Sequence, residues 1–257
     1  MTKSLIGMGM AALFVCGCAR PAAVVYQNST IDALLDGNYD GELTLAELKR
    51  HGDFGLGTFD ALDGEMVLLD GACYQVRSDG SVATPPDSSE TPLGVAVRWR
   101  PSSKAVTLQP GDYARLQAQL DGLRANDGHA YAVRVDGVMA TIRTRSVPRQ
   151  AEPYPRLSEV VKTQPTFDFR NARGTLVGFW FPESMRHVNV PGYHFHFLTD
   201  DRRAGGHVLG LSLESGTARA MELDAVQVAL PRRAPTTRPS ADRGGELDAV
   251  EKPGGGR

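Results

Sequence analysis

The sequence predicts a mixed α/β (α+β) fold in which strands predominate. Apolar stretches bounded by Asp-Gly and Gly-rich turns fill much of 55–76, 130–147 and 174–230, whereas helical spacing with capping signals occurs in shorter segments. The chain has 257 residues, of which 41% are hydrophobic and 23% charged, and its net charge is −2. This length can bury a sizeable core. The composition indicates a globular protein without the basic surface that nucleic-acid binding requires.

Residues 1–18 are interpreted as an export signal that is not part of the fold. Lys3 precedes the apolar run SLIGMGMAALFVCGC, which is short for a membrane span but has the length of a signal-peptide core. Its end, Val15 to Cys18, resembles the lipobox of bacterial lipoproteins, with Cys18 as the lipidated residue. The alternative is simple cleavage near ARPAA. We therefore expect an exported protein with a lipid anchor in a membrane, on the periplasmic or extracellular face.

Residues 24–150 are expected to form an N-terminal α/β domain. Thr44 and Glu47 have the spacing of a capping box, and Gly52 is a stop signal. Cys73 lies in an apolar strand pattern and is expected to be buried and inert. The predicted elements are helices at 29–37 and 44–52, strands within 55–76 separated by Asp-Gly turns at 63–64 and 70–71, a surface loop at 80–92, a strand at 94–99, a helix at 110–124, and two strands within 130–147 joined at Asp136-Gly137.

A change in composition follows this domain. The segment at 147–157, VPRQAEPYPRL, contains three prolines and is the best candidate for a domain boundary. Beyond it we expect a β-rich metal-binding domain at 151–230, which begins with a short helix at 158–163. The tail at 231–257 is rich in Pro, Arg and Gly, and this composition predicts a flexible segment.

Three of the six histidines lie in the stretch GYHFHFLTDDRRAGGHVLG at 192–210. In a strand, His194 and His196 project from one face, while the alternate phenylalanines project toward the core. Gly205-Gly206 would allow a tight reversal that brings His207 back beside the pair. Three converging imidazoles leave open coordination positions, which is typical of catalytic rather than structural zinc. The alternative is a polar edge of an ordinary hairpin.

The other histidines, His51, His129 and His187, lack such partners and are expected to be structural or exposed. The spacing alone leaves the metal chemistry open. A cupin-type iron oxygenase would need a Glu about four residues after the second His, where this sequence has Asp200 and Asp201. A site like that of carbonic anhydrase would place its third His much farther along the chain.

Taken together with HGDFGLGTFDALDGEM, RTRSVPRQ and GTLVGFWFPESM, the histidine segment resembles the bacterial α-acetolactate decarboxylase family. The resemblance extends from about Tyr26 to Glu251, with the motifs in the family's order. It implies an N-terminal α/β part whose mixed sheet extends across a homodimer, a smaller C-terminal β-barrel, and zinc on the three histidines. It also implies decarboxylation of 2-acetolactate to acetoin and CO₂, in acetoin and 2,3-butanediol biosynthesis.

The same resemblance assigns the metal ligands to His194, His196 and His207, and active-site positions to Thr58, Glu65, Arg145 and Glu251. A zinc ion would act as the Lewis acid that accepts the electrons released with CO₂. Arg145 could hold the substrate carboxylate, and the two glutamates are candidates for proton relay or water positioning.

The tail then has two parts. PTTRPSADRGG is expected to be a mobile tether, and ELDAVE is expected to dock, with Leu247 and Val250 packed on the barrel. Two other classes remain open, namely a cupin-like metal-dependent oxygenase and a metal-binding lipoprotein without catalysis.

Overall fold

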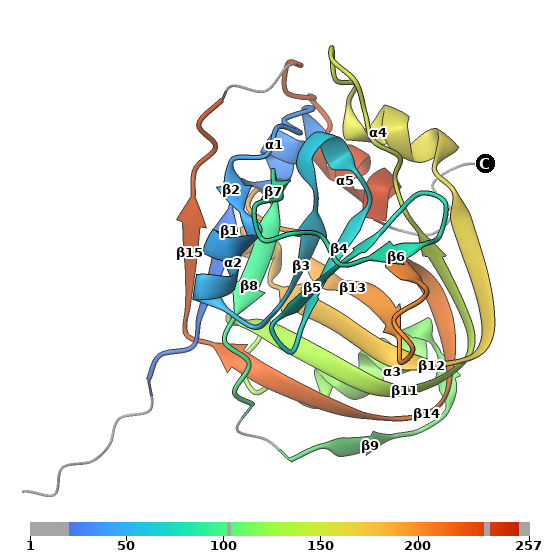
Figure 1. Ribbon diagram of the computed structural model, residues 1–257. Coiled ribbons are helices and arrows are strands. Elements are labelled where there is room, and N and C mark those ends of the chain that lie inside the picture. Colours follow the sequence, from blue (N-terminus) through green and yellow to red (C-terminus); the bar gives the residue numbers. More distant parts are fainter. Residues whose placement is uncertain (1–20, 102–103, 234–236, 252–257) are drawn as a thin grey trace, which may run out of the picture.

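The computed structural model describes residues 21–101, 104–233 and 237–251 (Figure 1). The predicted signal peptide and lipobox lie outside these residues. Within the described part of the chain, no helix is long and apolar enough to cross a membrane. The fold is a mixed α+β arrangement dominated by strands, as the sequence predicts.

A mixed seven-stranded sheet is built mainly by the N-terminal half of the chain (Figure 1). Its strands, in spatial order, are β15 (Ala225–Ala229), β1 (Val24–Asn28), β8 (Gly94–Val97), β3 (Phe54–Thr58), β4 (Glu65–Leu69), β5 (Ala72–Val76) and β6 (Val82–Ala83). The β15–β1 pair is parallel and the other pairs are antiparallel. The predicted Asp-Gly turns are confirmed, because Gly64, Asp70 and Gly71 all have positive φ.

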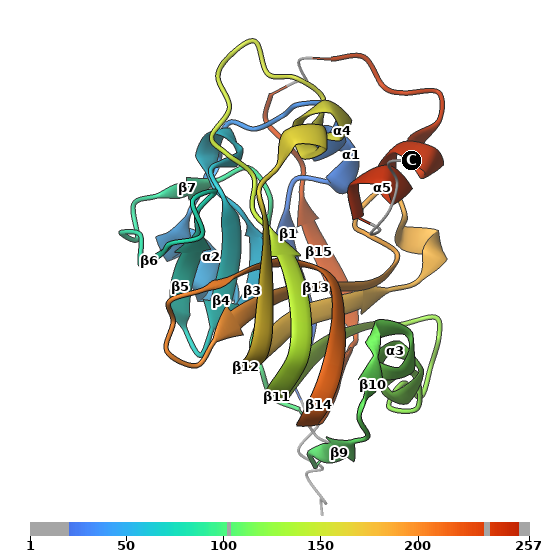
Figure 2. The ribbon, with the colours of Figure 1, turned by 90° about the vertical axis from the view of Figure 1, so that its right-hand side faces the viewer.

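A second sheet carries the histidines and is built from longer strands (Figure 2). Its six strands are β9 (Val106–Leu108), β10 (Gly111–Asp112), β11 (Ala130–Arg145), β12 (Thr166–Phe181), β13 (Gly192–Thr199) and β14 (Gly205–Leu223). A small third sheet pairs β2 (Leu43–Thr44) with β7 (Glu90–Thr91).

The helices are short. They are α1 (Ile31–Leu35), α2 (Leu45–His51), α3 (Tyr113–Asp121), α4 (Leu157–Val160), α5 (Arg243–Glu251) and the 3-10 turns η1 (Asp60–Leu62), η2 (Val161–Thr163) and η3 (Glu183–Met185). The predicted capping box is present, because Thr44 accepts a hydrogen bond from the Glu47 backbone and the Glu47 carboxylate accepts one from the Thr44 backbone. The helix predicted at 110–124 begins only at Tyr113, where Asp112 caps it.

The prediction of two strands within 130–147 is wrong. β11 runs through Asp136-Gly137 without a turn and is hydrogen-bonded on both sides, to β12 and to β14. Gly137 stands opposite Gly174 on one side and Gly216 on the other. A Cβ atom at Gly137 would lie 2.3 Å from the Ser215 carbonyl oxygen. The glycine therefore serves close approach of neighbouring strands rather than chain reversal, and long-range pairing overrides the local turn signal.

The expected separate C-terminal barrel takes a different form. β13 pairs with β12 along its whole length but with β14 over only three residue pairs, so the second sheet curls back on itself only at this hairpin. The sheets also cut across the predicted domain division. The proline-rich segment at 147–157 connects β11 and β12, which are neighbours in one sheet, and β15 joins the N-terminal sheet.

One core lies between the two sheets, where Phe54 and Val67 of the first sheet pack with Phe179 and Leu198 of the second, and another lies between the second sheet and α3. Cys73 is buried in a separate cluster with residues of α2, as expected. A further cluster joins α1, α4 and α5 beside the histidine end of the second sheet (Figure 2). The three histidines therefore lie where the first sheet, the second sheet and the helical cluster meet.

Candidate metal centre

The three predicted histidines converge at the β13–β14 hairpin. His194 and His196 lie on one face of β13, while Phe195 and Phe197 are buried in the core on the other face. His207 stands directly opposite His196 in the β13–β14 ladder. Their ligand atoms all lie within 4.8 Å of one another. The sequence prediction of a converging group is therefore confirmed.

The reversal itself differs from the expectation. The chain turns over residues 200–204, where the Thr199 backbone donates to the Ala204 carbonyl oxygen. Gly205 and Gly206 are already part of β14. A Cβ at Gly206 would lie 2.4 Å from the Arg145 carbonyl oxygen, so these glycines let three strands approach closely where the ligands meet.

The imidazoles have the protonation state that metal ligation needs. Burial, reinforced by the positive charge of Arg145, lowers the pKa of His194 to about 3. Burial likewise lowers the pKa values of His196 and His207 well below their ordinary range. All three side chains are therefore neutral at physiological pH and present lone pairs.

Two hydrogen-bonding observations test the fit of a metal. The Nδ1 atom of His196 lies 2.7 Å from the Met66 carbonyl oxygen. This carbonyl can only accept, so Nδ1 carries the proton and the Nε2 lone pair faces the other histidines. Within the described residues, the buried Nε2 atom of His207 has no hydrogen-bond partner. Three neutral imidazoles, one oriented from behind and one with an unsatisfied nitrogen, fit a divalent cation.

The two predicted glutamates approach this group from different layers. Glu65 at the start of β4 places Oε2 3.4 Å from His196 Nε2. Glu251 at the end of α5 places Oε2 3.6 Å from His207 Nε2 and 3.9 Å from His194 Nε2. Glu65 comes from the first sheet, so the site is assembled from both sheets and the C-terminal helix.

Burial dominates the acidity of both carboxyls. It raises the pKa of Glu65 to about 7, against the opposing effect of Arg145 and with a smaller contribution from Glu251. It raises the pKa of Glu251 to about 7 in the same way, again opposed by Arg145. Burial therefore outweighs the charge of Arg145 at both carboxyls, and a bound cation would lower both pKa values.

Arg145 and Thr58 also lie at the site. Arg145 is buried on β11, where it pairs with His207 of β14. Its Nη1 donates to Gln164 Oε1 at 2.7 Å, and its Nη2 lies 3.9 Å from Glu251 Oε1. Thr58 pairs with Glu65 across β3 and β4, and its hydroxyl donates to the Gly64 carbonyl oxygen at 2.7 Å. Thr58 thus holds the turn that delivers Glu65.

A narrow cavity of about 50 Å³ lies among these residues. It is lined by all seven predicted site residues together with an apolar wall formed by Ile31, Leu34, Leu56, Gly57, Leu62, Leu93, Val147 and Leu157. The sequence analysis missed this wall, Gln164 and the Met66 carbonyl. Apolar side chains of α1 and η1 look like ordinary core residues in the sequence, and a backbone acceptor carries no residue-type signal.

The C-terminal helix is anchored by charge as well as by packing. The Arg156 guanidinium donates to both carboxylate oxygens of Glu246 at 2.7 and 2.6 Å and lies 3.0 Å from Asp36. Arg243 pairs with the same buried Asp36. This group, Asp36, Arg156, Arg243 and Glu246, is called the α5 anchor below, and it ties α5 to α1 and α4.

Leu247 and Val250 are buried, but the expectation that they pack on the barrel is wrong. They pack with residues of α1 and α4 instead. The predicted tether is described only in part. Residues 234–236 lie outside the described chain, while Thr237 donates its backbone N–H to Asp36 O at 3.1 Å.

The remaining histidines lie away from the site, as expected. His51 stacks on Tyr26 with ring centroids 3.6 Å apart. His129 and His187 are exposed and pair with Glu222 and Asp32.

One cavity is surrounded by three convergent neutral imidazoles, two buried carboxyls and a guanidinium. This arrangement is typical of a metalloenzyme active site. Comparison with known proteins identifies the family. The profile of the alpha-acetolactate decarboxylase family matches residues 25–237. The chain belongs to this family, which confirms the resemblance found in the sequence.

Individual relatives agree. The alpha-acetolactate decarboxylase of Methylococcus capsulatus is 47% identical over 191 residues, covering 74% of this chain and 74% of that protein. The Klebsiella aerogenes enzyme of the same name is 41% identical and covers 82% of each chain. The crystal structure of alpha-acetolactate decarboxylase from Bacillus subtilis strain 168 matches with a TM-score of 0.85 and 34% identity, over 89% of this chain and 99% of that one.

Proposed function

We propose that this protein is a metal-dependent carboxy-lyase that converts 2-acetolactate to acetoin and CO₂, in the biosynthesis of acetoin and 2,3-butanediol. Family membership over most of the chain supports the reaction. The observation that carries the proposal is the convergence of His194, His196 and His207 with Glu65, Arg145 and Glu251 around one cavity.

The three histidines would hold the metal, and we propose zinc because a three-imidazole set that leaves open positions suits it. When bound, the metal supplies Lewis acidity to the hydroxyl and carbonyl oxygens of the substrate. The orienting contact from Met66 O to His196 fixes one ligand in advance.

Arg145 binds the substrate carboxylate. Its guanidinium is buried and is fixed by Gln164, so it offers a preorganised fork for two carboxylate oxygens. The apolar wall excludes water from the other side of the cavity. In water, a carboxylate must give up its hydration shell when it becomes neutral CO₂. In this cavity most of that hydration has already been lost, so the change to CO₂ costs less.

Glu65 and Glu251 hold or move the proton that completes acetoin. Both carboxyl groups are within 4 Å of a ligand nitrogen, on β4 and α5 respectively. Burial raises the pKa of each carboxyl and so opposes the lowering that a bound cation would cause. Thr58 acts indirectly, by fixing the turn before Glu65.

The decisive experiment is anaerobic incubation of the purified, metal-loaded protein with racemic 2-acetolactate, followed by measurement of acetoin and CO₂. We expect equal amounts of both products, formed from one enantiomer faster than from the other. A cupin-like oxygenase would be inactive without dioxygen and would need iron. A metal-binding lipoprotein without catalysis would contain metal and release no acetoin above the buffer rate.

We further propose that the mature protein is lipidated at Cys18 and anchored on the outer side of a membrane. Lys3, the short apolar run and Gly17-Cys18 motivate this. Mass spectrometry of the membrane fraction should find a diacylated N-terminal peptide beginning at Cys18, absent when Cys18 is replaced by Ser. An intact Met1 or an unmodified N-terminus would refute it.

A homodimer is the proposed assembly, on the basis of the family resemblance and because β15 and β6 are the edge strands of the seven-stranded sheet, which a second copy can extend. Sedimentation equilibrium of detergent-solubilised protein should give twice the chain mass. A monomer at micromolar concentration would contradict this assembly.

A further inference from the structure

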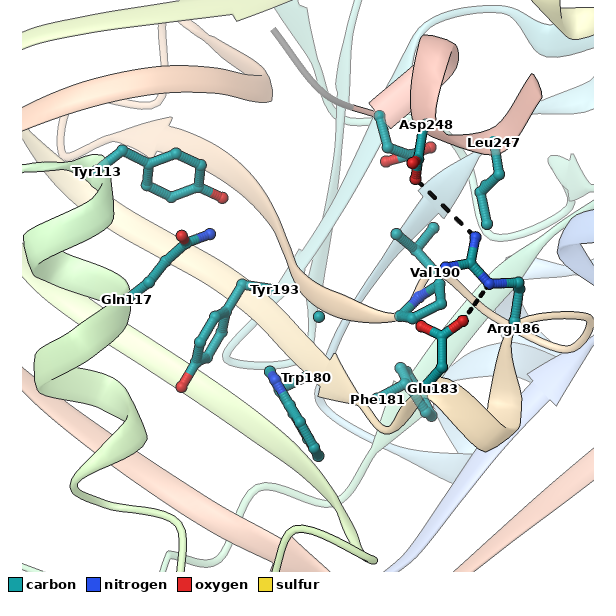
Figure 3. Close-up of a pocket in the computed structure, with 13 residues that line it drawn as sticks. Tyr113, Gln117, Trp180, Phe181, Glu183, Arg186, Val190, Tyr193, Leu247 and Asp248 are labelled. Atoms are coloured by element: carbon teal, nitrogen blue, oxygen red, sulfur yellow. Dashed lines mark hydrogen bonds and ion pairs between the residues drawn. The ribbon is translucent and has the colours of Figure 1, made fainter. Parts of the chain in front are cut away.

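A second, larger cavity is lined by residues of α3 and α5, among others (Figure 3). Its volume is about 590 Å³, against about 50 Å³ for the cavity at the histidines. Tyr113 and Gln117 reach into it from α3, Trp180 and Tyr193 form a wall on β12 and β13, and Leu247 and Asp248 project from α5 (Figure 3). We call this space the outer cavity.

The outer cavity adjoins the metal centre at one residue. Glu251 lines both spaces. We call the cavity of about 50 Å³ at the histidines the inner cavity. All residues that line it are buried except His194 and Glu251, whose side chains are 11% and 10% exposed. The two residues before His194, Gly192 and Tyr193, line the outer cavity. Because the partly exposed Glu251 is shared by both spaces, the outer cavity leads up to the centre at this side chain.

The walls of the outer cavity are held in place by contacts behind them. The Arg124 guanidinium lies 3.7 Å from the Trp180 ring centroid. The Tyr193 hydroxyl donates to Asp121 Oδ1 at 3.0 Å. At the rim, Arg186 is paired with Glu183 and lies 3.9 Å from Asp248 (Figure 3). The space is thus a formed cavity with aromatic surfaces and a few polar groups, which suits a small oxygenated molecule.

We propose that the outer cavity is the entrance through which a small hydroxy-keto acid reaches the metal centre, passing between α3 and α5 and beside Glu251. This inference rests on the proposed function for the identity of the molecule, but not for the existence of the route. Tyr113 and Gln117 supply hydroxyl and amide groups that hydrogen-bond to substrate oxygens on the way.

The test places a removable obstruction in the outer cavity of the folded holoenzyme. Gln117→Cys is labelled with benzyl methanethiosulfonate, and Ala118→Cys, on the exposed side of the same helix, is labelled identically as the matched control. Wild-type protein treated with the reagent controls for the natural cysteines. Cys73 is buried, and burial raises the pKa of its thiol to about 12, so it does not react.

Two quantities are measured for each labelled protein. One is kcat/KM for 2-acetolactate. The other is the rate at which the bound metal is removed by pyridine-2,6-dicarboxylate, a small chelator that is a carboxylate anion like the substrate. We expect both to fall on the order of tenfold for the label at position 117 and to stay unchanged at position 118. Release of the label with a thiol should restore both.

Equal metal-removal rates for the two labelled proteins would overturn the route. A slower removal at position 117 with an unchanged kcat/KM would overturn the assignment to substrate. If wild-type protein does not decarboxylate 2-acetolactate, the proposed function fails, whereas the comparison of metal-removal rates still decides whether the outer cavity leads to the centre.

Discussion

The chemistry of individual residues at this centre is set by contacts from distant parts of the chain. His196 is oriented by a carbonyl 130 residues away in sequence, at Met66. Glu65 and Glu251 acquire raised pKa values because both are buried, although each belongs to a segment that looks solvent-exposed in the sequence. The residue types are therefore necessary for the site, but their environments determine what they do.

A substitution at one ligand tests the metal centre at this scale. We expect His196→Ala to lose most of its bound metal, because two imidazoles bind a divalent ion far more weakly than three, and to lose all decarboxylase activity. His129→Ala is the control, since His129 is exposed, pairs with Glu222 and lines neither cavity. Metal content by mass spectrometry and acetoin production are the measurements. Full activity of a metal-free preparation would refute the role of the metal.

At the scale of elements, α5 is the part of the active site with the least local support. It has nine residues, which is too few for stability as an isolated helix. Leu247 and Val250 bury its apolar side against α1 and α4, and the α5 anchor holds its first turn. Glu251 at the other end is then brought to the histidines.

Removal of most of α5 should separate folding from catalysis. We expect deletion of residues 246–257 to lower turnover by orders of magnitude, while metal content and circular dichroism stay close to wild type, because the ligands and both sheets remain. Glu251→Ala should reproduce most of the loss. Ala249→Ser, on the exposed side of the same helix, is the control. Wild-type turnover of the truncated protein would show that Glu251 has no catalytic role.

The α5 anchor also predicts a pH dependence. Burial alone would raise the pKa of Glu246, but hydrogen bonds from Arg156 and Ser158 and the charges of Arg156 and Arg243 outweigh it and lower the pKa. A lowered pKa means that the docked helix is stabilised above the pKa of the undocked carboxyl, about 4.3, and that this stabilisation is lost as pH falls through the docked value.

Hydrogen exchange of the 243–251 peptide, corrected for intrinsic rates, should therefore show loss of protection below about pH 4 in the wild-type protein. In Glu246→Gln protection should be weaker at neutral pH and should change less with pH in that window. Asp248→Asn should behave like the wild type. Identical pH profiles for Glu246→Gln and the wild-type protein would show that the Glu246 carboxylate does not stabilise the docked helix.

At the scale of the whole molecule, the site lies where the two sheets and the helical cluster meet. The sheets share a core that is independent of the ligands, so the fold does not require the metal. The ligand group nevertheless exists only in the folded chain, because His196 and His207 meet through strand pairing.

Removal of the metal should lower the melting temperature without unfolding the protein. A ligand present at about a thousand times its Kd stabilises the native state by about 4 kcal/mol, which corresponds to roughly ten degrees for a chain of this size. Calorimetry of the chelated and reloaded protein measures the shift, and His196→Ala should show none. Loss of strand structure on chelation would contradict an independent core.

The converging histidines, the family and most short elements could be predicted from the sequence alone. The H-x-H pattern places two imidazoles on one face of any strand, and the capping box and Asp-Gly turns act within a few residues, so neither depends on the rest of the fold. It failed at Asp136-Gly137, where a local turn signal lies within a strand paired on both sides. The tertiary structure alone decided the layering of the sheets, the docking of α5 through Asp36 and Arg156, and the raised pKa values of the carboxyls. Each of these depends on burial and on contacts between segments far apart in the chain, which residue type and spacing do not encode.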